Sequence, residues 1–255
     1  MSYLQINNLT IENKTTKEIL LNNINLTIDK NKILGIIGES GSGKSLLCKT
    51  LLGILPSNLK VKGSIKLNNI ELLENSKIIK NSFSIILQEA MNAFNPLYKI
   101  KSHMLESIQI PLSKEKKIEL CKKTLKRVGL NNTEKILTSY AHELSGGQLQ
   151  RVMIAIALVQ NKHIIVADEP TSSLDTINQK EIIEIFKNLK KTIIFVSHDL
   201  ALISYLADEV IILKEGNIKE KSTKNNIFYK PKNSYTKFLL KTQKNLSEGF
   251  ISCLK

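Results

Sequence analysis

The sequence of 255 residues contains no tryptophan, only three cysteines and only two arginines. Cys48, Cys121 and Cys253 lie far apart and form no Cys-x-x-Cys pair, so neither a disulfide framework nor a cysteine metal site is predicted. No apolar run approaches the roughly 18–20 residues of a membrane-spanning helix. The N-terminus, MSYLQINNLT, lacks the basic and then apolar pattern of a signal peptide. We therefore expect a soluble, cytoplasmic chain.

The formal net charge is +14, which raises the question of nucleic-acid binding. Arg127 and Arg151 are the only arginines, although arginine is the preferred residue for phosphate forks and base edges. The lysines are spread along the chain, and aromatic residues make up only 5% of it, too few for a base-stacking surface. The composition thus disfavours a specific nucleic-acid surface. A basic face toward anionic lipid headgroups explains the positive charge better than a nucleic-acid surface does.

A phosphate-binding motif, GESGSGKS, fits the pattern G-x-x-x-x-G-K-[ST] at every fixed position. An apolar run at 33–37 precedes it and a potential helix at 46–52 follows, which is the context that the motif requires. Backbone N–H groups of such a loop and the helix N-terminus bind phosphates, the lysine reaches the β- and γ-phosphates, and the serine hydroxyl ligates Mg²⁺. The predicted nucleotide-binding residues are Gly38, Glu39, Ser40, Gly41, Ser42, Gly43, Lys44 and Ser45.

Two carboxylates follow a second buried-type strand, which ends in Ala167-Asp168-Glu169. Ligands bind at the carboxyl ends of the strands in open α/β sheets. We expect Asp168 to hold Mg²⁺, directly or through water, and Glu169 to orient and polarise the water that attacks the γ-phosphate.

A second glycine-rich helix start occurs at Leu144-Ser145-Gly146-Gly147-Gln148, directly before a helix-like segment at 149–158. Ser145, Gly147 and Gln148 are therefore candidates for a second anion site at a helix N-terminus. The loop at 38–45 and the helix start at 144–148 of one chain cannot bind the same phosphate unless the segment between them folds back onto the loop. A second copy of the protein would solve this.

The order of patterns predicts an α/β fold with a mainly parallel sheet, because strands alternate with helices. An antiparallel β part is expected near the N-terminus and a helical insert after residue 92. Strands are predicted at 3–11, 19–28, 33–37, 62–67, 83–87, 163–167, 192–197 and 210–213, with a return strand from Ile218 and a helix at 177–189. We divide the chain into an ATP-binding domain at 1–225 (core 1–91 and 160–225, helical subdomain 92–159) and a basic C-terminal extension at 226–255.

Taken together, GESGSGKS, LSGGQ, ADEP and SHD resemble the ATP-binding subunit of ATP-binding-cassette (ABC) transporters over roughly residues 3–225. The resemblance implies a P-loop ATPase that uses ATP and Mg²⁺. In it, Gln88 is the lid glutamine that senses Mg²⁺ and the membrane partner, Ser173-Leu174-Asp175 is the inter-subunit loop, and His198 contacts the γ-phosphate. The implied partners are a second ABC ATPase chain, identical or similar, two transmembrane permeases and an extracytoplasmic substrate-binding protein, at the cytoplasmic face of the membrane.

Local segments, among them Leu51–Pro56, Ala93–Leu97 and Pro231–Leu240, resemble the peptide/nickel importer branch, and its nickel-type subunit in particular. Nickel or a metal chelate is the cargo that this implies, with an oligopeptide or dipeptide importer as the alternative. A soluble ABC ATPase that acts on nucleic acid or ribosomes is the alternative from another class, and an exporter subunit shares the same chemistry. Asn13 occupies the position where relatives stack an aromatic on adenine, so base stacking should be weak or supplied elsewhere.

Overall fold

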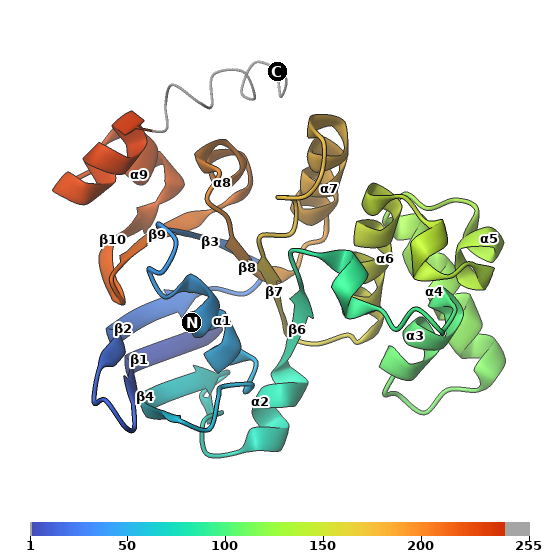
Figure 1. The fold of residues 1–255 in the computed structure, drawn as a ribbon, viewed down its shortest axis with the longest axis horizontal. Helices are drawn as coiled ribbons and strands as arrows, with labels where there is room; N and C mark the ends of the chain where they lie inside the picture. The colour runs from blue at the N-terminus through green and yellow to red at the C-terminus, as the bar shows by residue number, and fades with distance from the viewer. Residues whose placement is uncertain (1, 243–255) are drawn as a thin grey trace.

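The computed structural model describes residues 2–242. Its strands gather in one lobe, and helices α3 to α6 form a second lobe beside them (Figure 1). This arrangement confirms the expected fold class, an α/β core with a small antiparallel part and a helical insert. Among the described helices, none combines the length and the apolar character that a bilayer crossing requires.

The larger sheet has six strands, and those at its centre are buried on both faces. All of its neighbouring strands are parallel except β9 and β10, the antiparallel pair at one edge of the sheet. In spatial order the strands are β10 (Asn217–Thr223), β9 (Glu209–Lys214), β3 (Ile33–Ile37), β8 (Thr192–Val196), β7 (Ile164–Asp168) and β6 (Phe83–Ile86). The carboxyl ends of β3, β7 and β8 therefore meet at one edge, where the predicted phosphate loop and carboxylates follow.

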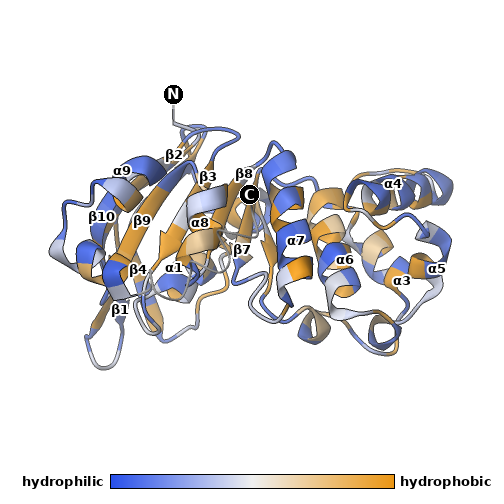
Figure 2. Ribbon diagram, turned by 90° about the horizontal axis from the view of Figure 1, so that it is seen from above, coloured by the Kyte–Doolittle hydropathy of each residue, from blue (hydrophilic) through white to orange (hydrophobic). Residues whose placement is uncertain are grey.

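Alternate residues of these strands enter two separate apolar cores, as the two-residue period of a strand requires. In β8, Ile193 and Phe195 pack with helices α6 (Gly146–Val159), α7 (Thr176–Asn188) and α8 (Leu200–Leu206). Ile194 and Val196 instead pack with α1 (Lys44–Leu51) and the smaller sheet. In Figure 2 the central strands are mainly hydrophobic, whereas α7 is largely hydrophilic.

The smaller sheet is antiparallel and covers one side of the larger one. Its strands follow the order β2 (Ile19–Ile28), β1 (Leu4–Asn13), β4 (Leu59–Leu67) and β5 (Ile70–Glu71). The helix α2 (Ser76–Ser82) leads from this sheet to β6. Neither β5 nor α2 was predicted from the sequence, because both are short and carry little periodicity.

The helical lobe is held together by the apolar positions that repeat at helical spacing. Cys121, Leu125 and Val128 are fully buried. Both arginines of this lobe donate hydrogen bonds to backbone carbonyls. Arg127 Nη2 donates to Leu189 O at 2.9 Å, and Arg151 Nη1 donates to Val128 O at 3.3 Å. The lobe contains η1 (Ala90–Ala93), α3 (Ile100–Ser107), α4 (Lys114–Arg127), α5 (Thr133–Thr138), η2 (Ala141–Glu143) and α6. The two guanidinium groups thus connect backbone segments within the fold.

Two further helices follow β10: α9 (Lys224–Tyr229) and a helix at 234–242. The boundary that we expected at residue 225 falls inside α9. Thr236 is fully buried and Leu239 is 4% exposed, so part of the expected extension packs into the core. Cys253 lies outside the described residues.

Candidate active site

The phosphate-binding loop lies between β3 and α1, and its two inner glycines adopt the left-handed region. Gly41 has a φ of +79° and Gly43 a φ of +104°, values that residues with a Cβ rarely adopt. A Cβ on Gly43 would also lie 2.5 Å from Leu21 Cδ2. The loop conformation therefore depends on glycine, as the motif predicts.

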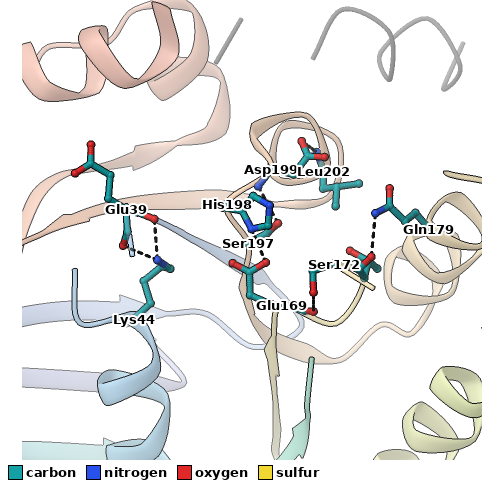
Figure 3. A network of polar contacts seen from close by, with 11 residues as sticks. Glu39, Lys44, Glu169, Ser172, Gln179, Ser197, His198, Asp199 and Leu202 are labelled. Atoms are coloured by element: carbon teal, nitrogen blue, oxygen red, sulfur yellow. Dashed lines mark hydrogen bonds and ion pairs between the residues drawn. The ribbon is translucent and has the colours of Figure 1, made fainter. Parts of the chain in front are cut away.

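The ammonium group of Lys44 folds back over this loop. Its Nζ donates to Gly38 O at 2.7 Å and to Glu39 O at 2.8 Å (Figure 3). Burial lowers the pKa of Lys44, and the negative charges of Glu169 and Asp168 oppose that shift. The third N–H of the ammonium remains for an acceptor in the cavity, which is the role that a phosphate oxygen would fill.

A cavity of about 700 Å³ opens over the loop and brings together most of the predicted site residues. Ser42 is the exception within the motif: it is 4% exposed, and its backbone O accepts from Gly216 N at 3.0 Å, so it anchors the loop to the β9–β10 turn. The predicted residues that line the cavity are Gly38, Glu39, Ser40, Gly41, Gly43, Lys44, Ser45, Gln88, Asp168, Glu169 and His198.

Glu169 follows the last residue of β7 in a strained backbone conformation. Its φ is +50°, and such a left-handed residue other than glycine costs on the order of 1–3 kcal/mol. Hydrogen bonds hold the peptide in place: Glu169 N donates to Val196 O at 3.0 Å, and Glu169 O accepts from Ser172 Oγ at 3.1 Å. Strain of this kind is found at functional sites, where it fixes the direction of a side chain.

The side chain of Glu169 points toward His198, which comes from the end of the neighbouring strand β8. Glu169 Oε2 and His198 Nδ1 are 2.7 Å apart. The imidazole is itself exposed, and Asp199 caps the following helix through Oδ1, which accepts from Ala201 N at 2.7 Å. Figure 3 shows this pair facing Lys44 across the site. Glu169 and His198, the two residues predicted to act near the γ-phosphate, thus lie side by side.

The oxygen donors in the cavity suit Mg²⁺. Ser45 supplies a hydroxyl, Gln88 an amide oxygen and Asp168 a carboxylate, the hard ligands that this ion prefers. Within residues 2–242, no three His, Cys, Asp or Glu side chains gather so as to hold a metal ion. The donor set therefore fits an ion bound jointly by protein and phosphate.

The second glycine-rich motif begins α6 with a reciprocal capping box. Gln148 N donates to Ser145 Oγ at 3.3 Å, and Ser145 N donates to Gln148 Oε1 at 3.1 Å. These bonds satisfy two of the N-terminal groups and leave the N–H groups of the glycines free of intrahelical partners. Ser145, Gly147 and Gln148 are not among the residues that line the 700 Å³ cavity, so the two predicted anion sites of one chain are separate.

The start of α6 packs against the start of α7. Asp175 caps α7 through Oδ1, which accepts from Asn178 N at 3.0 Å, and its Oδ2 accepts from Asn178 Nδ2 at 2.6 Å. A Cβ on Gly147 would lie 2.3 Å from Asn178 Oδ1. The Asn178 amide therefore sits directly under Gly147 and connects this motif with the loop at 173–175.

Gly147→Ala should therefore destabilise the protein by about 1–2 kcal/mol through overpacking. In an Asn178→Ala background the same change should be neutral or stabilising by up to about 1 kcal/mol, because alanine is the better helix former. Urea unfolding midpoints measure both costs. Gly146→Ala is the matched control, since its Cβ would find Leu174 Cδ2 at 3.7 Å, an ordinary contact. An equal cost of Gly147→Ala in both backgrounds would contradict the packing argument.

Sequence reasoning missed four apolar residues of the cavity: Ile37 and Leu46 directly flank the phosphate-binding motif, and Leu20 and Leu239 belong to no motif. Asn13, the position compared with the usual adenine-stacking aromatic, does not line the cavity. Its Oδ1 instead accepts from Thr15 N at 2.9 Å and forms a local turn. Among the described residues, no Phe, Tyr or Trp lines the cavity.

Comparison with known proteins gives consistent matches. The sequence model of the family described as ABC transporter matches residues 21–172. The metal-staphylopine import system ATP-binding protein of Staphylococcus aureus is 36% identical, over 98% of this chain and 96% of its own length. An oligopeptide transport ATP-binding protein of Haemophilus influenzae is 35% identical, over 91% of this chain and 76% of its own.

Two solved structures extend these matches to the fold. A Clostridium perfringens protein, part of an ABC transporter complex, has a TM-score of 0.78 and 26% identity, and the alignment covers 99% of this chain and 98% of that one. An ATP-binding cassette solved as a dimer in a post-hydrolysis state, bound to ADP and Pi, has a TM-score of 0.74 and 28% identity, over 86% of this chain and 98% of its own.

Proposed function

This chain belongs to the ATP-binding subunits of the ABC transporter family, and on that premise we propose that it hydrolyses ATP to power an importer for a metal, taken up as a chelate or as nickel. The proposal of ATP hydrolysis is supported by the cavity, because the phosphate-binding loop, Asp168, Glu169 and His198 all line it. The cargo part rests on the metal-staphylopine relative.

In the proposed reaction, the loop at 38–45 binds the phosphates of ATP, and Lys44 donates to their oxygens. Ser45, Gln88 and Asp168 would hold Mg²⁺, which when bound neutralises phosphate charge. Glu169 orients a water molecule and accepts its proton as the water oxygen bonds to the γ-phosphorus. The bond to the β–γ bridging oxygen breaks, ADP leaves, and His198 steadies both the Glu169 carboxylate and the γ-phosphate.

A second chain completes the site in this proposal. Ser145, Gly147 and Gln148 lie outside the cavity of their own chain, so the free N–H groups there would reach the γ-phosphate of ATP bound to a partner, identical or similar. The dimeric relative bound to ADP and Pi supports this arrangement. ATP would bind the closed dimer more tightly than the open one, and that difference sets the work available for transport.

The remaining proposed partners are two membrane permeases and an extracytoplasmic substrate-binding protein, which places this subunit at the cytoplasmic face of the membrane. Cargo recognition would fall to those proteins, since residues 2–242 gather no metal-ligand group. The oligopeptide transport relative supports a peptide importer as the second candidate.

Uptake by cells that lack this chain separates the candidates. Cells are complemented with the parent or with Glu169→Gln, and the accumulation of nickel, of a chelated divalent metal and of a labelled oligopeptide is measured. We expect cells with the variant to accumulate at least about fivefold less metal, because transport needs ATP turnover. Their peptide accumulation should be unchanged, because in this proposal the peptide is not the cargo. Loss of the peptide alone would assign the second candidate. Unchanged uptake of all three, with RNA binding that survives physiological salt, would favour the soluble class.

A further inference from the structure

The helix at 234–242 lies against the phosphate-binding loop, far from it in sequence and beyond the family match at 21–172. Leu239 from this helix lines the nucleotide cavity and is 4% exposed. It belongs to the same apolar cluster as Leu200 of α8, the helix that follows His198. One side chain of the C-terminal segment thus forms part of the cavity wall.

Tyr235 meets the loop itself, next to Glu39. Burial and then the negative charge of Glu39 raise the pKa of Tyr235, which places the carboxylate beside the phenol. The buried Tyr235 hydroxyl makes no hydrogen bond of normal geometry among the described residues, and the Tyr235 side chain packs at the edge of the larger apolar core. Lys214 Nζ lies 4.5 Å from the ring centroid on the β9–β10 hairpin side.

The segment before the helix is fixed by backbone hydrogen bonds. The Glu220 carboxylate of β10 accepts from Lys232 N at 2.9 Å and from Asn233 N at 3.1 Å. Asn233 Oδ1 in turn accepts from Tyr235 N at 2.8 Å at the helix start. The position of Tyr235 is therefore set by the sheet and not by the loop that it touches.

We propose that Tyr235 and Leu239 are positioning residues for the nucleotide, so that docking of the helix at 234–242 and nucleotide binding stabilise each other. The inference rests on the proposed ATPase function. The loop holds two left-handed glycines and has much freedom to lose, so a contact that pre-organises it saves part of the entropy cost of binding. Tyr235 lies beside Glu39, and the backbone O of Glu39 accepts from Lys44 Nζ at 2.8 Å, so only one residue separates Tyr235 from the phosphate-binding lysine.

Single substitutions on one helix test the proposal in the full chain. Tyr235→Ala and Leu239→Ala should each raise the Kd for ADP and the KM for ATP about tenfold and leave kcat within about twofold, because ground-state and transition-state binding weaken together. Tyr235→Phe should bind as the parent does, since it keeps the ring that packs against the apolar core. Phe238→Ala is the matched control, because Phe238 is 59% exposed on the same helix.

Hydrogen exchange in the unmodified protein provides a measurement that needs no variant. By reciprocity, ADP should slow exchange of the amides at 236–242 more than that of the amides in α4. Parent-like affinity in both alanine variants, or exchange at 236–242 that ADP leaves unchanged, would overturn the inference while leaving the ATPase proposal intact. Absence of nucleotide binding by the parent would overturn both.

Discussion

Glu169→Gln is expected to lower steady-state ATP hydrolysis at least about a hundredfold and to leave ATP affinity nearly unchanged, because a positioned general base contributes about 10²–10⁴ in rate. The substitution keeps the shape of the side chain and its contact with His198 but removes the negative charge that accepts a proton. The backbone of Glu169, held at a φ of +50° by Val196 and Ser172, should stay in place.

The measurement is phosphate release under saturating ATP, together with the Kd for ATP. With ATP and Mg²⁺, the variant should also elute as a dimer in size-exclusion chromatography, since the closed state no longer resets. Glu119→Gln, which changes an exposed carboxylate on α4, serves as the control and should keep the parental rate. A Glu169→Gln rate within about threefold of the parent would remove Glu169 from its assigned role.

Residues that are close in sequence were predictable here, because their pattern and their chemistry coincide. The run at 33–37 became β3 with the phosphate loop directly after it, and the run at 163–167 became β7 with Asp168 at its end. Parallel strands bring their carboxyl ends to one edge of a sheet. That the cavity gathers Lys44, Asp168 and Glu169 was therefore foreseeable from local sequence alone.

Contacts between distant segments were not predictable in this way. Leu239 lines the cavity because the helix that carries it packs against the core, where Thr236 and Leu239 are buried. In sequence both residues lie in a lysine-rich stretch of low periodicity, which does not predict this packing. The Asn178 amide under Gly147 likewise depends on how α6 and α7 pack. Asn13 occupies the position where relatives stack an aromatic on adenine, so weak stacking was predicted there, and its side chain closes a local turn.

Lys44→Ala should weaken ATP binding at least about a hundredfold, a larger effect on affinity than any other substitution considered, since a charge-assisted bond to phosphate is lost from a partly buried site. Lys44 is held between two backbone carbonyls and faces the carboxylates of Asp168 and Glu169. Without the ammonium, the phosphates would meet those carboxylates with one positive charge fewer. The loss should appear for ADP as well, and more strongly for ATP, because Lys44 reaches the γ-phosphate too.

Isothermal titration of ATP and ADP into the parent and the variant measures both losses. Lys49→Ala is the control, because Lys49 is exposed and lies on the same helix, α1. It removes one charge from the same helix and should change affinity less than about threefold, as expected for an exposed charge. Asn13→Tyr should also stay within about threefold, since Asn13 does not line the cavity. If Lys44→Ala kept ATP affinity within that range, the base and not the phosphates would dominate binding, and the loop at 38–45 would lose its assigned role.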